Sequence, residues 1–302
     1  MRMAVSEEAL QKYRRAGKIA AEVREYMKRT VSEGMPIIDI CEKTEALIKE
    51  KGGKLAFPCN VSVNEIAAHY TSPPNDKRTI PENSVVKVDI GAHVDGYIAD
   101  TAVTVCFNPE HDILVRTAEE ALETGIKTLH PGLSISAFGA TIQKTIETRG
   151  CKPISNLTGH QLGHYLIHTG KSLPNVSHFS MAKVNLGEIY AIEPFVTVPK
   201  AAGRIEYGRE AYIFRFLKRK SLKNEYAKQL LDYIFKNFRT LPFTERWLQN
   251  IVPSNHYKAA FAELLDKKAL MTYPIFVEAS EKPVAQAEHT VIVTKDGCSV
   301  LT

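Results

Sequence analysis

The chain has 302 residues, of which 44% are hydrophobic and 24% are charged, and its formal net charge is +5. This length suits one large domain, or one domain with a smaller insertion, and the composition is that of an ordinary globular protein. The sequence has no long uninterrupted apolar run and its first residues are charged, so it predicts neither a membrane-spanning helix nor a secretory signal, and we expect no membrane partner.

Five cysteines give a first indication of the compartment. They are scattered, odd in number, and never form a Cys-x-x-Cys pair. This usage argues against a disulfide framework or a zinc knuckle and indicates a reducing environment. We therefore expect a cytoplasmic protein.

Helix patterns occur twice in the first half of the chain. Apolar residues at steps of three and four predict a long helix over 6–32 and a second helix that ends at a Gly-Gly pair. The same order of helix, Gly/Pro break and helix recurs over 113–150. The intervals Gly34–Gly52 and Gly132–Gly150 are equal in length, which is a weak sign of an internal duplication.

A β-hairpin is predicted around Asp95-Gly96, because this pair is a strong turn signal between the alternating runs Val85–Asp89 and Tyr97–Phe107. A two-residue turn here places Asp89 and Asp100 diagonally on one strand face, about 7–8 Å apart at most. Two carboxylates so placed among apolar residues repel each other unless a cation lies between them. If they face solvent at a loop edge instead, no cation is needed, and the hairpin alone does not decide between these interpretations.

Other candidate ligands interrupt apolar or glycine-bearing runs. Glu193 and Glu288 each stand in a strand-like apolar segment, where a buried acid needs a partner, although each alone is more typical of a strand edge. His160, His164 and His168 recur every four residues, but the glycines among them argue against a stable helix. Gln161 stands where an HExxH zinc site needs Glu, so that motif is excluded.

Residues 200–272 stand apart by their charge. They hold 15 Lys or Arg against 7 Asp or Glu, a net charge of +8, whereas the rest of the chain has a net charge of −3. The pattern predicts helices over 222–238, 243–251 and 257–271, between strand-like segments on either side. We expect an α+β fold with central antiparallel strands, in which 1–199 and 273–302 form the catalytic domain and 200–272 form an inserted basic helical subdomain.

Taken together, these segments resemble the methionine aminopeptidases, and the inserted helices resemble the type II subclass of archaea and eukaryotes. The similarity covers nearly the whole chain, and every ligand position of the family is filled in order. The matching segments are Ala67-Ala-His69-Tyr-Thr, Asp89-Ile-Gly-Ala, Asp100-Thr-Ala, Gly159-His160, Ile167-His168, Ala191-Ile-Glu193-Pro and Gln286-Ala-Glu288-His289-Thr.

The resemblance implies a pseudo-symmetric pita-bread fold of the creatinase/aminopeptidase type, which agrees with the suspected duplication. It also implies an enzyme with two divalent metal ions (Co, Mn, Fe or Zn) and a bridging water or hydroxide as nucleophile. By this resemblance Asp89 chelates one metal, Asp100 and Glu288 bridge both, and His160 and Glu193 complete the shell of the second. The implied reaction removes the initiator methionine from peptides and nascent chains, with a preference for a small second residue.

The resemblance also assigns residues that contact the substrate. Glu193 is the expected general acid/base, and His69 and His168 are the expected donors to the scissile amide and its oxyanion. Phe57, Ile167 and Tyr273 resemble the lining of a methionine pocket. An interpretation of those three as plain core residues explains the sequence almost equally well.

Two alternatives differ in testable ways. A prolidase or X-Pro aminopeptidase shares the metal site but usually carries a large extra N-terminal domain, whereas only a short segment precedes the core here. A catalytically inactive relative that binds RNA or ribosomes would lose ligands, and the set here is intact. The +8 segment leaves a ribosome partner open, although a solvated helical face explains the charge equally well. We expect a monomer.

Overall fold

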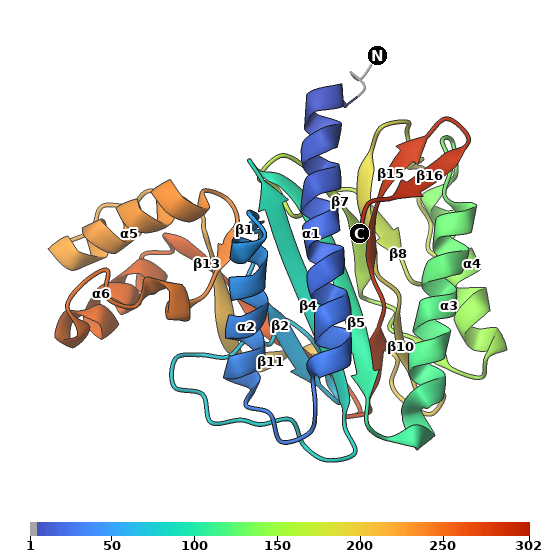
Figure 1. The fold of residues 1–302 in the computed structure, drawn as a ribbon, viewed down its shortest axis with the longest axis horizontal. Helices are drawn as coiled ribbons and strands as arrows, with labels where there is room; N and C mark the ends of the chain where they lie inside the picture. The colour runs from blue at the N-terminus through green and yellow to red at the C-terminus, as the bar shows by residue number, and fades with distance from the viewer. Residues whose placement is uncertain (1–4) are drawn as a thin grey trace.

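Two pairs of helices pack against antiparallel strands in residues 5–302, the part of the chain that this computed structural model describes (Figure 1). The first pair is α1 (Glu7–Thr30) and α2 (Ile37–Glu50), and the second is α3 (Asp112–Thr128) and α4 (Ile135–Thr148). Ser6 begins α1 by accepting a hydrogen bond from the backbone N–H of Ala9 at 3.2 Å. All four helices that the sequence predicts in the first half are confirmed.

The strands of the described residues form four antiparallel sheets. The first sheet has the order β1-β4-β2 with β5 paired to β4, the second β14-β10-β6, the third β12-β11-β13-β3, and the fourth β16-β15-β9-β7-β8. The strand bounds are β1 Lys54–Leu55, β2 Asn60–Val63, β3 Ile66–Ala68, β4 Val85–Val94, β5 Tyr97–Cys106, β6 Lys152–Pro153, β7 Thr158–Leu162, β8 Ser172–Pro174, β9 Ile189–Ile192, β10 Phe195–Thr197, β11 Ile205–Phe216, β12 Pro242–Phe243, β13 Leu270–Glu278, β14 Val284–Gln286, β15 His289–Thr294 and β16 Gly297–Val300.

The internal duplication is visible in the backbone. Gly34 and Gly132 both have positive φ, 78° and 85°, and each donates a 2.8 Å hydrogen bond to a carbonyl on the segment that returns past the helix pair. One residue pair in each copy also forms an isolated bridge, Pro36 with Thr79 and Ser134 with Lys183. Because glycine adopts positive φ without strain, the chain turns in the same way after corresponding helices. The two halves therefore repeat one supersecondary unit.

Each helix pair buries its apolar face on its own half of the strands. Residues such as Ile19, Val23 and Ile40 form one core with β4 and β2, and residues such as Leu114 and Phe138 form another with β9 and β15. Burial of such side chains contributes about 25 cal/mol per Å² and stabilises each half. The strands between them carry the polar residues described below. None of the described helices has the length and hydropathy of a membrane span.

Residues 200–272 differ in part from the sequence prediction. They begin with β11, which pairs with β13, and β13 continues past the predicted boundary at 272. The predicted helix over 222–238 is confirmed as α5 (Glu225–Phe238). The one over 243–251 is wrong, because β12 and a 3-10 turn, η2 (Glu245–Leu248), occupy that stretch. The last helix is α6 (Ser254–Asp266), which stops short of 271 because Lys268 adopts a positive φ of 53°.

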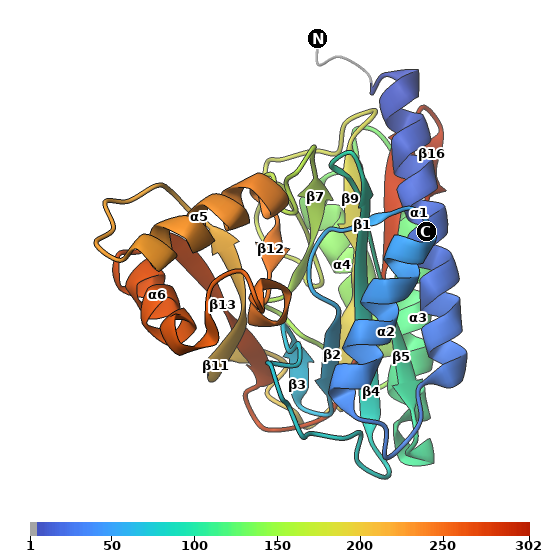
Figure 2. The ribbon, with the colours of Figure 1, turned by 60° about the vertical axis from the view of Figure 1, so that its left-hand side comes forward.

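The helices α5 and α6 share a separate apolar core with β11, which includes Phe214, Leu230 and Phe261. Figure 2 shows them on the far side of β11 and β13 from α1 and α2. The third sheet thus connects this segment to the rest of the molecule, because β13 also pairs with β3. One face of β11 and β13 is directed toward the strands that carry the predicted ligands, since Ile213 and Tyr273 line the same cavity as those ligands.

Candidate metal centre

The β4–β5 hairpin places the first two acids as the sequence predicts. Val94 pairs with Tyr97 and Gly91 pairs with Asp100, so Asp89 lies diagonally across the ladder from Asp100. Asp100 is only 3% exposed. Its backbone is held by Thr290 of β15, whose hydroxyl accepts from the Asp100 N–H at 2.7 Å and donates to the Asp100 carbonyl at 2.8 Å. The hairpin and the second half of the molecule are therefore joined at this acid.

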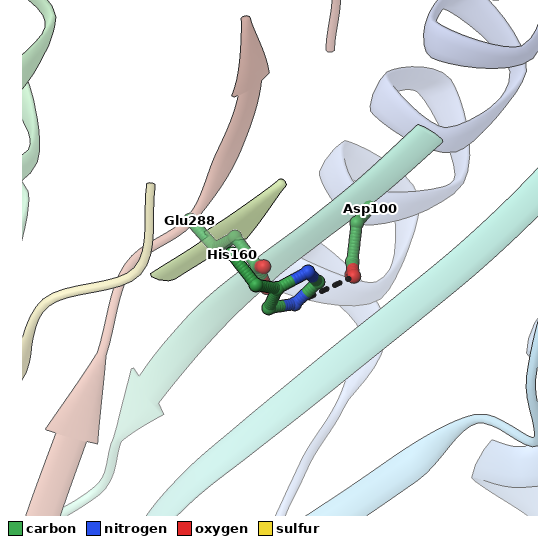
Figure 3. A group of neighbouring side chains, drawn as sticks. All are labelled: Asp100, His160 and Glu288. Atoms are coloured by element: carbon green, nitrogen blue, oxygen red, sulfur yellow. Dashed lines mark ion pairs between the residues drawn. The ribbon is translucent and has the colours of Figure 1, made fainter. Parts of the chain in front are cut away.

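The other three predicted ligands come from the second half. His160 lies in β7, Glu193 follows β9, and Glu288 precedes β15. The Nε2 atom of His160 lies 3.4 Å from Glu193 Oε1 and 3.6 Å from Asp100 Oδ2. One donor atom from each of Asp100, His160 and Glu288 falls within 4.8 Å of the others, and Figure 3 shows these three side chains converging.

Without a bound cation, the four carboxyl groups repel one another when they are ionised, so they cannot easily all carry a charge at once. Burial raises the pKa of Asp89 to about 7. Burial and the neighbouring acids raise the pKa of Asp100, Glu193 and Glu288 well above the usual range. Burial lowers the pKa of His160 well below its usual value, so the imidazole is neutral and can act as a ligand.

Unpaired atoms in this cluster fit a bound cation. Asp89 Oδ1 and Asp100 Oδ1 are buried without a hydrogen-bond partner in the described residues, and the Nε2 atom of His160 faces the acids. Buried oxygen atoms without partners are costly, and divalent cations satisfy carboxylate oxygens and imidazole nitrogens together. Four acids and one neutral histidine therefore form a donor set that suits divalent metal ions.

All ten residues that the sequence singles out for this site line one cavity. Besides the five candidate ligands, its lining includes both candidate substrate histidines and the three candidate pocket residues. These residues are Phe57, His69, Asp89, Asp100, His160, Ile167, His168, Glu193, Tyr273 and Glu288. Residues from widely separated parts of the sequence thus meet at one place, although lining a cavity does not itself assign a role to any of them.

The two candidate substrate histidines come from separate segments of the chain and both line this cavity. His69 follows β3 with a positive φ of 67°, and its Nδ1 lies 3.3 Å from the carbonyl of Pro274. The ring of His168 packs edge-on against His160 with centroids 4.2 Å apart. Burial lowers the pKa of His69 to about 4 and also lowers the pKa of His168. Both imidazoles are therefore neutral near pH 7 and carry one N–H each. The carbonyl of Pro274 can only accept, so the N–H of His69 lies on Nδ1 and its Nε2 is an acceptor.

A second, outer cleft opens from the same residues. It shares His69, His168, Glu193 and Tyr273 with the inner cavity. The rest of its lining is mostly aromatic or apolar and includes Leu157, Phe195, Tyr207, Met271 and Phe276. A peptide whose first residue enters the inner cavity would therefore extend along this cleft.

The sequence reasoning missed several residues that position the acids. Gln286 donates through Nε2 to Glu193 and to Glu288, at 3.3 Å each. Asn60 pairs with Asp89 across β2 and β4, and its Nδ2 lies 3.5 Å from Asp89 Oδ2. Gln286 stands two residues before Glu288, and in an extended segment this spacing directs both side chains to the same side, so its role could have been inferred. Nothing in the local sequence marks Asn60, because its partner lies on a different strand.

Comparisons with known proteins agree with this geometry. The model of metallopeptidase family M24 matches residues 11–295. The chain is 41% identical to a methionine aminopeptidase of Methanothermobacter thermautotrophicus, over 97% of this chain and 98% of that protein. It is 44% identical to a methionine aminopeptidase of Thermococcus kodakarensis, over 95% and 97% respectively.

Solved structures show the same fold at lower identity. A thermophilic Arx1 superposes with a TM-score of 0.85 at 19% identity, over 99% of this chain and 91% of that one. A methionine aminopeptidase of Thermotoga maritima gives 0.72 at 22% identity, over 100% and 99%. A prolidase of Pyrococcus furiosus gives 0.64 at 16% identity and covers all of this chain, but only 65% of the prolidase is matched.

Proposed function

Because this chain belongs to metallopeptidase family M24, we propose that its five converging side chains hold two divalent metal ions at which the N-terminal methionine of a substrate is released. The chain has the pita-bread fold of the family, and it is a metallo-hydrolase that removes N-terminal methionine from peptides and nascent proteins. The single observation that carries the proposed site is the convergence of all ten predicted residues on one cavity.

The proposed ligand roles follow the positions of the acids. Asp89 would hold one ion, Asp100 and Glu288 would be shared by both, and His160 and Glu193 would complete the second site. The convergence of Asp100, His160 and Glu288 within 4.8 Å supports a metal-binding role for these three residues. When bound, two such ions lower the pKa of a shared water and polarise the scissile carbonyl. The donor set accepts Co, Mn, Fe or Zn and is less suited to Ca, because it includes an imidazole.

The remaining side chains act on the substrate. His168, which is neutral, donates a hydrogen bond toward the oxyanion that develops on the scissile amide. His69 contacts the scissile amide and accepts from its N–H through Nε2, because the N–H of His69 is directed to the Pro274 carbonyl. Glu193, oriented by Gln286, passes a proton to the leaving amine. Phe57, Ile167 and Tyr273 form the apolar slot for the methionine side chain. Their shared place beside the acids supports this role.

We assign the chain to the type II subclass and treat 200–272 as an accessory subdomain of a cytoplasmic monomer. The similarity to archaeal methionine aminopeptidases supports the subclass. The separate apolar core of α5 and α6 supports the subdomain. The prolidase alternative is less well supported, because this chain matches only 65% of the prolidase but nearly all of the methionine aminopeptidases.

The first expected result concerns the second residue of the substrate. Met-Ala-Ser should be cleaved roughly 100-fold faster than Met-Lys-Ser, because an extra group that a closed site cannot accommodate costs about 1–3 kcal/mol or more in the transition state. Met followed by Gly, Ser, Thr, Val, Pro or Cys should also be cleaved, and Met followed by Leu, Glu or an aromatic residue should not. Release of free methionine, measured by liquid chromatography, gives the ratio of kcat/KM values.

A blocked substrate serves as the control for this result. Acetyl-Met-Ala-Ser should be inert, because the free amino group is expected to reach the metal centre. If Met-Lys-Ser and Met-Ala-Ser were hydrolysed at equal rates, the enzyme would be a broader aminopeptidase than proposed. Release of a free amino acid from Ala-Pro peptides in place of Met-Ala-Ser would favour the prolidase alternative.

A ribosome partner is a second proposal, supported by the +8 charge of 200–272. The densest cluster in that segment is Arg215, Lys218, Arg219, Lys220 and Lys223. Arg219 is engaged locally, since it forms a 2.8 Å ion pair with Asp232 and lies over the ring of Phe235. The side chains of Lys218, Lys220 and Lys223 are exposed and form no ion pair within the described residues. They are the charges that can contact RNA phosphates.

We expect co-sedimentation with ribosomes at low salt that is lost as salt increases, because binding to phosphates releases counterions. Changing Lys218, Lys220 and Lys223 together to Gln should weaken co-sedimentation by about tenfold at moderate salt and reduce its salt dependence. The same change at Lys43, Lys49 and Lys77, which are exposed elsewhere on the molecule and form no ion pair within the described residues, is the matched control. Ribosome binding that is absent at low salt, or indifferent to salt, would contradict the proposal.

A further inference from the structure

Arg215 is flanked by residues that line the inner cavity and the outer cleft. It belongs to β11, where it pairs with Met271 of β13 and with Pro242 of β12. Side chains alternate along a strand, so Arg215 is on the same face as Ile213, two positions earlier. Ile213 and Pro242 line the inner cavity, and Met271 lines the outer cleft. The guanidinium is therefore attached to the face that borders the path of the substrate.

The charge of Arg215 has no acidic partner in residues 5–302. Arg219 and Arg246 of the same segment each form a 2.8 Å ion pair with a carboxylate, but no described carboxylate does so with Arg215. Its Nη2 donates to the sulfur of Met271 at 3.2 Å, and a thioether accepts only weakly. Its Nε is buried and has no partner within the described residues. A guanidinium in this state retains the capacity to bind a carboxylate through two parallel N–H groups.

The charge of Arg215 affects the pKa of two residues of the site. Burial lowers the pKa of His168, and the positive charge of Arg215 lowers it further. Burial raises the pKa of Tyr273, and the positive charge of Arg215 opposes that rise. The ladder pairs Arg215 with Met271 and Ile213 with Tyr273, so Arg215 lies diagonally across from one wall of the methionine pocket. The described lining of the outer cleft contains no lysine or arginine, so the field of Arg215 meets no competing cation there.

We propose that Arg215 determines specificity by binding a carboxylate that the substrate carries just beyond the scissile bond. The carboxylate belongs to an Asp or Glu side chain at the third or fourth residue or, in a tripeptide, to the free C-terminus. This inference rests on the proposed function, because it requires the methionine in the inner cavity and the rest of the peptide in the outer cleft. It assigns to Arg215 a role different from the RNA contact considered for its neighbours Lys218 and Lys220.

The test compares peptides that differ in one charge. The substrates are Met-Ala-Xaa-Gly-amide and Met-Ala-Gly-Xaa-amide, where Xaa is Asp, Asn or Lys, together with Met-Ala-Ser and its amide. Wild-type protein should cleave the better of the two Asp peptides about 3- to 10-fold faster in kcat/KM than its Asn counterpart, which is the range of a partly exposed ion pair. Its Lys counterpart should be slower than the Asn peptide. The advantage of Asp should shrink as salt increases.

Variants of two arginines on β11 separate a specific contact from a general charge effect. In Arg215→Gln the ratio of Asp to Asn peptides should fall to about one, and Arg215→Lys should retain part of it, because it keeps the charge and loses the paired N–H groups. Arg209→Gln is the matched control, since Arg209 is an exposed arginine of the same strand, and it should keep the wild-type ratio. Discrimination confined to Met-Ala-Ser over its amide would identify the free C-terminus as the carboxylate.

The failure of this proposal can be told from a failure of the proposed function. Turnover of the Asn peptides and of Met-Ala-Ser-amide by wild-type protein reports on methionine removal alone. If these peptides are cleaved while Asp, Asn and Lys peptides are cleaved at equal rates, and Met-Ala-Ser is cleaved no faster than its amide, Arg215 has no such role. The same conclusion follows if Arg215→Gln folds, as judged by circular dichroism, and keeps the wild-type ratio.

Discussion

Asp100→Asn should lower the rate of methionine release from Met-Ala-Ser on the order of 1,000-fold or more at saturating metal, with the fold retained. The substitution keeps the volume of the side chain and removes a charge that a bridging carboxylate must supply to two dications. Glu288→Gln should have the same effect for the same reason. Kinetics together with metal analysis by mass spectrometry would measure both the rate and the number of ions bound per chain.

The thermal stability of the metal-free variant shows whether Asp100→Asn lowers activity at the site alone or by unfolding the protein. Burial and the negative charge of Asp89 raise the pKa of Asp100 well above its usual range. The folded state therefore favours the protonated carboxyl of Asp100. Its contribution to the free energy of unfolding is fully present at acid pH and is lost as the pH rises from the ordinary pKa toward the raised pKa. Asp100→Asn removes this penalty. The metal-free variant should thus unfold at the same or a higher temperature than the metal-free wild type at neutral pH.

A buried acid outside the site gives the matched control. Glu278 is fully buried and accepts hydrogen bonds from Gly203 and Ser280, away from the cavity. Glu278→Gln should lose some stability but keep metal stoichiometry and the rate per folded molecule. Near-wild-type turnover by Asp100→Asn or Glu288→Gln at saturating metal would show that the five-ligand assignment is wrong.

His168→Ala should lower kcat by roughly 100- to 1,000-fold while the bound metal stays unchanged, because one oxyanion donor has about that effect in other enzymes. His168 stands beside His160, but it is assigned to the substrate and not to the metal. Continuous assays with Met-Ala-Ser give kcat, and metal analysis of the same sample gives the stoichiometry.

His164→Ala is the control for this experiment, because it removes a nearby histidine of the same loop. The side chain of His164 is accessible and contacts the carbonyl of Asp95, and it does not line the cavity. We expect it to leave both kcat and metal content close to wild type. A His168→Ala protein that binds fewer ions than wild type would make His168 a ligand instead of a substrate contact.

Local signals in the sequence were sufficient for much of this architecture. The Asp95-Gly96 turn fixes the register of β4 and β5, and that register alone brings Asp89 and Asp100 onto one face. The paired glycines of the duplication, such as Gly34 and Gly132, could be recognised because positive φ restricts which residues occupy those turns. Convergence of the other ligands required the resemblance to a family, since no local rule relates β7 to β15.

The segment 200–272 was less predictable for a physical reason. The strand β11 is mostly half-exposed or exposed along its first part and carries charged residues, so its sequence lacks the alternation that marks a strand. It is stabilised by its neighbour β13, from which α5 and α6 separate it along the chain. The role of Arg215 could not be predicted from the sequence for the same reason, because its strand partners lie far from it along the chain. In the sequence it belongs to a basic cluster, whereas in the structure its strand partners are Pro242 and Met271, which line the cavity and the cleft.

The central claim, that this chain removes N-terminal methionine at two metal ions held by five side chains, is tested most directly by titration. Protein stripped with a chelator would be given increasing amounts of Co²⁺ or Mn²⁺, and bound metal and the release of methionine from Met-Ala-Ser would be measured in the same samples. We expect no release without metal, restored release as metal is added, and two ions bound per chain at saturation. Release that persists in stripped protein, or that is unchanged by the metal, would contradict the account.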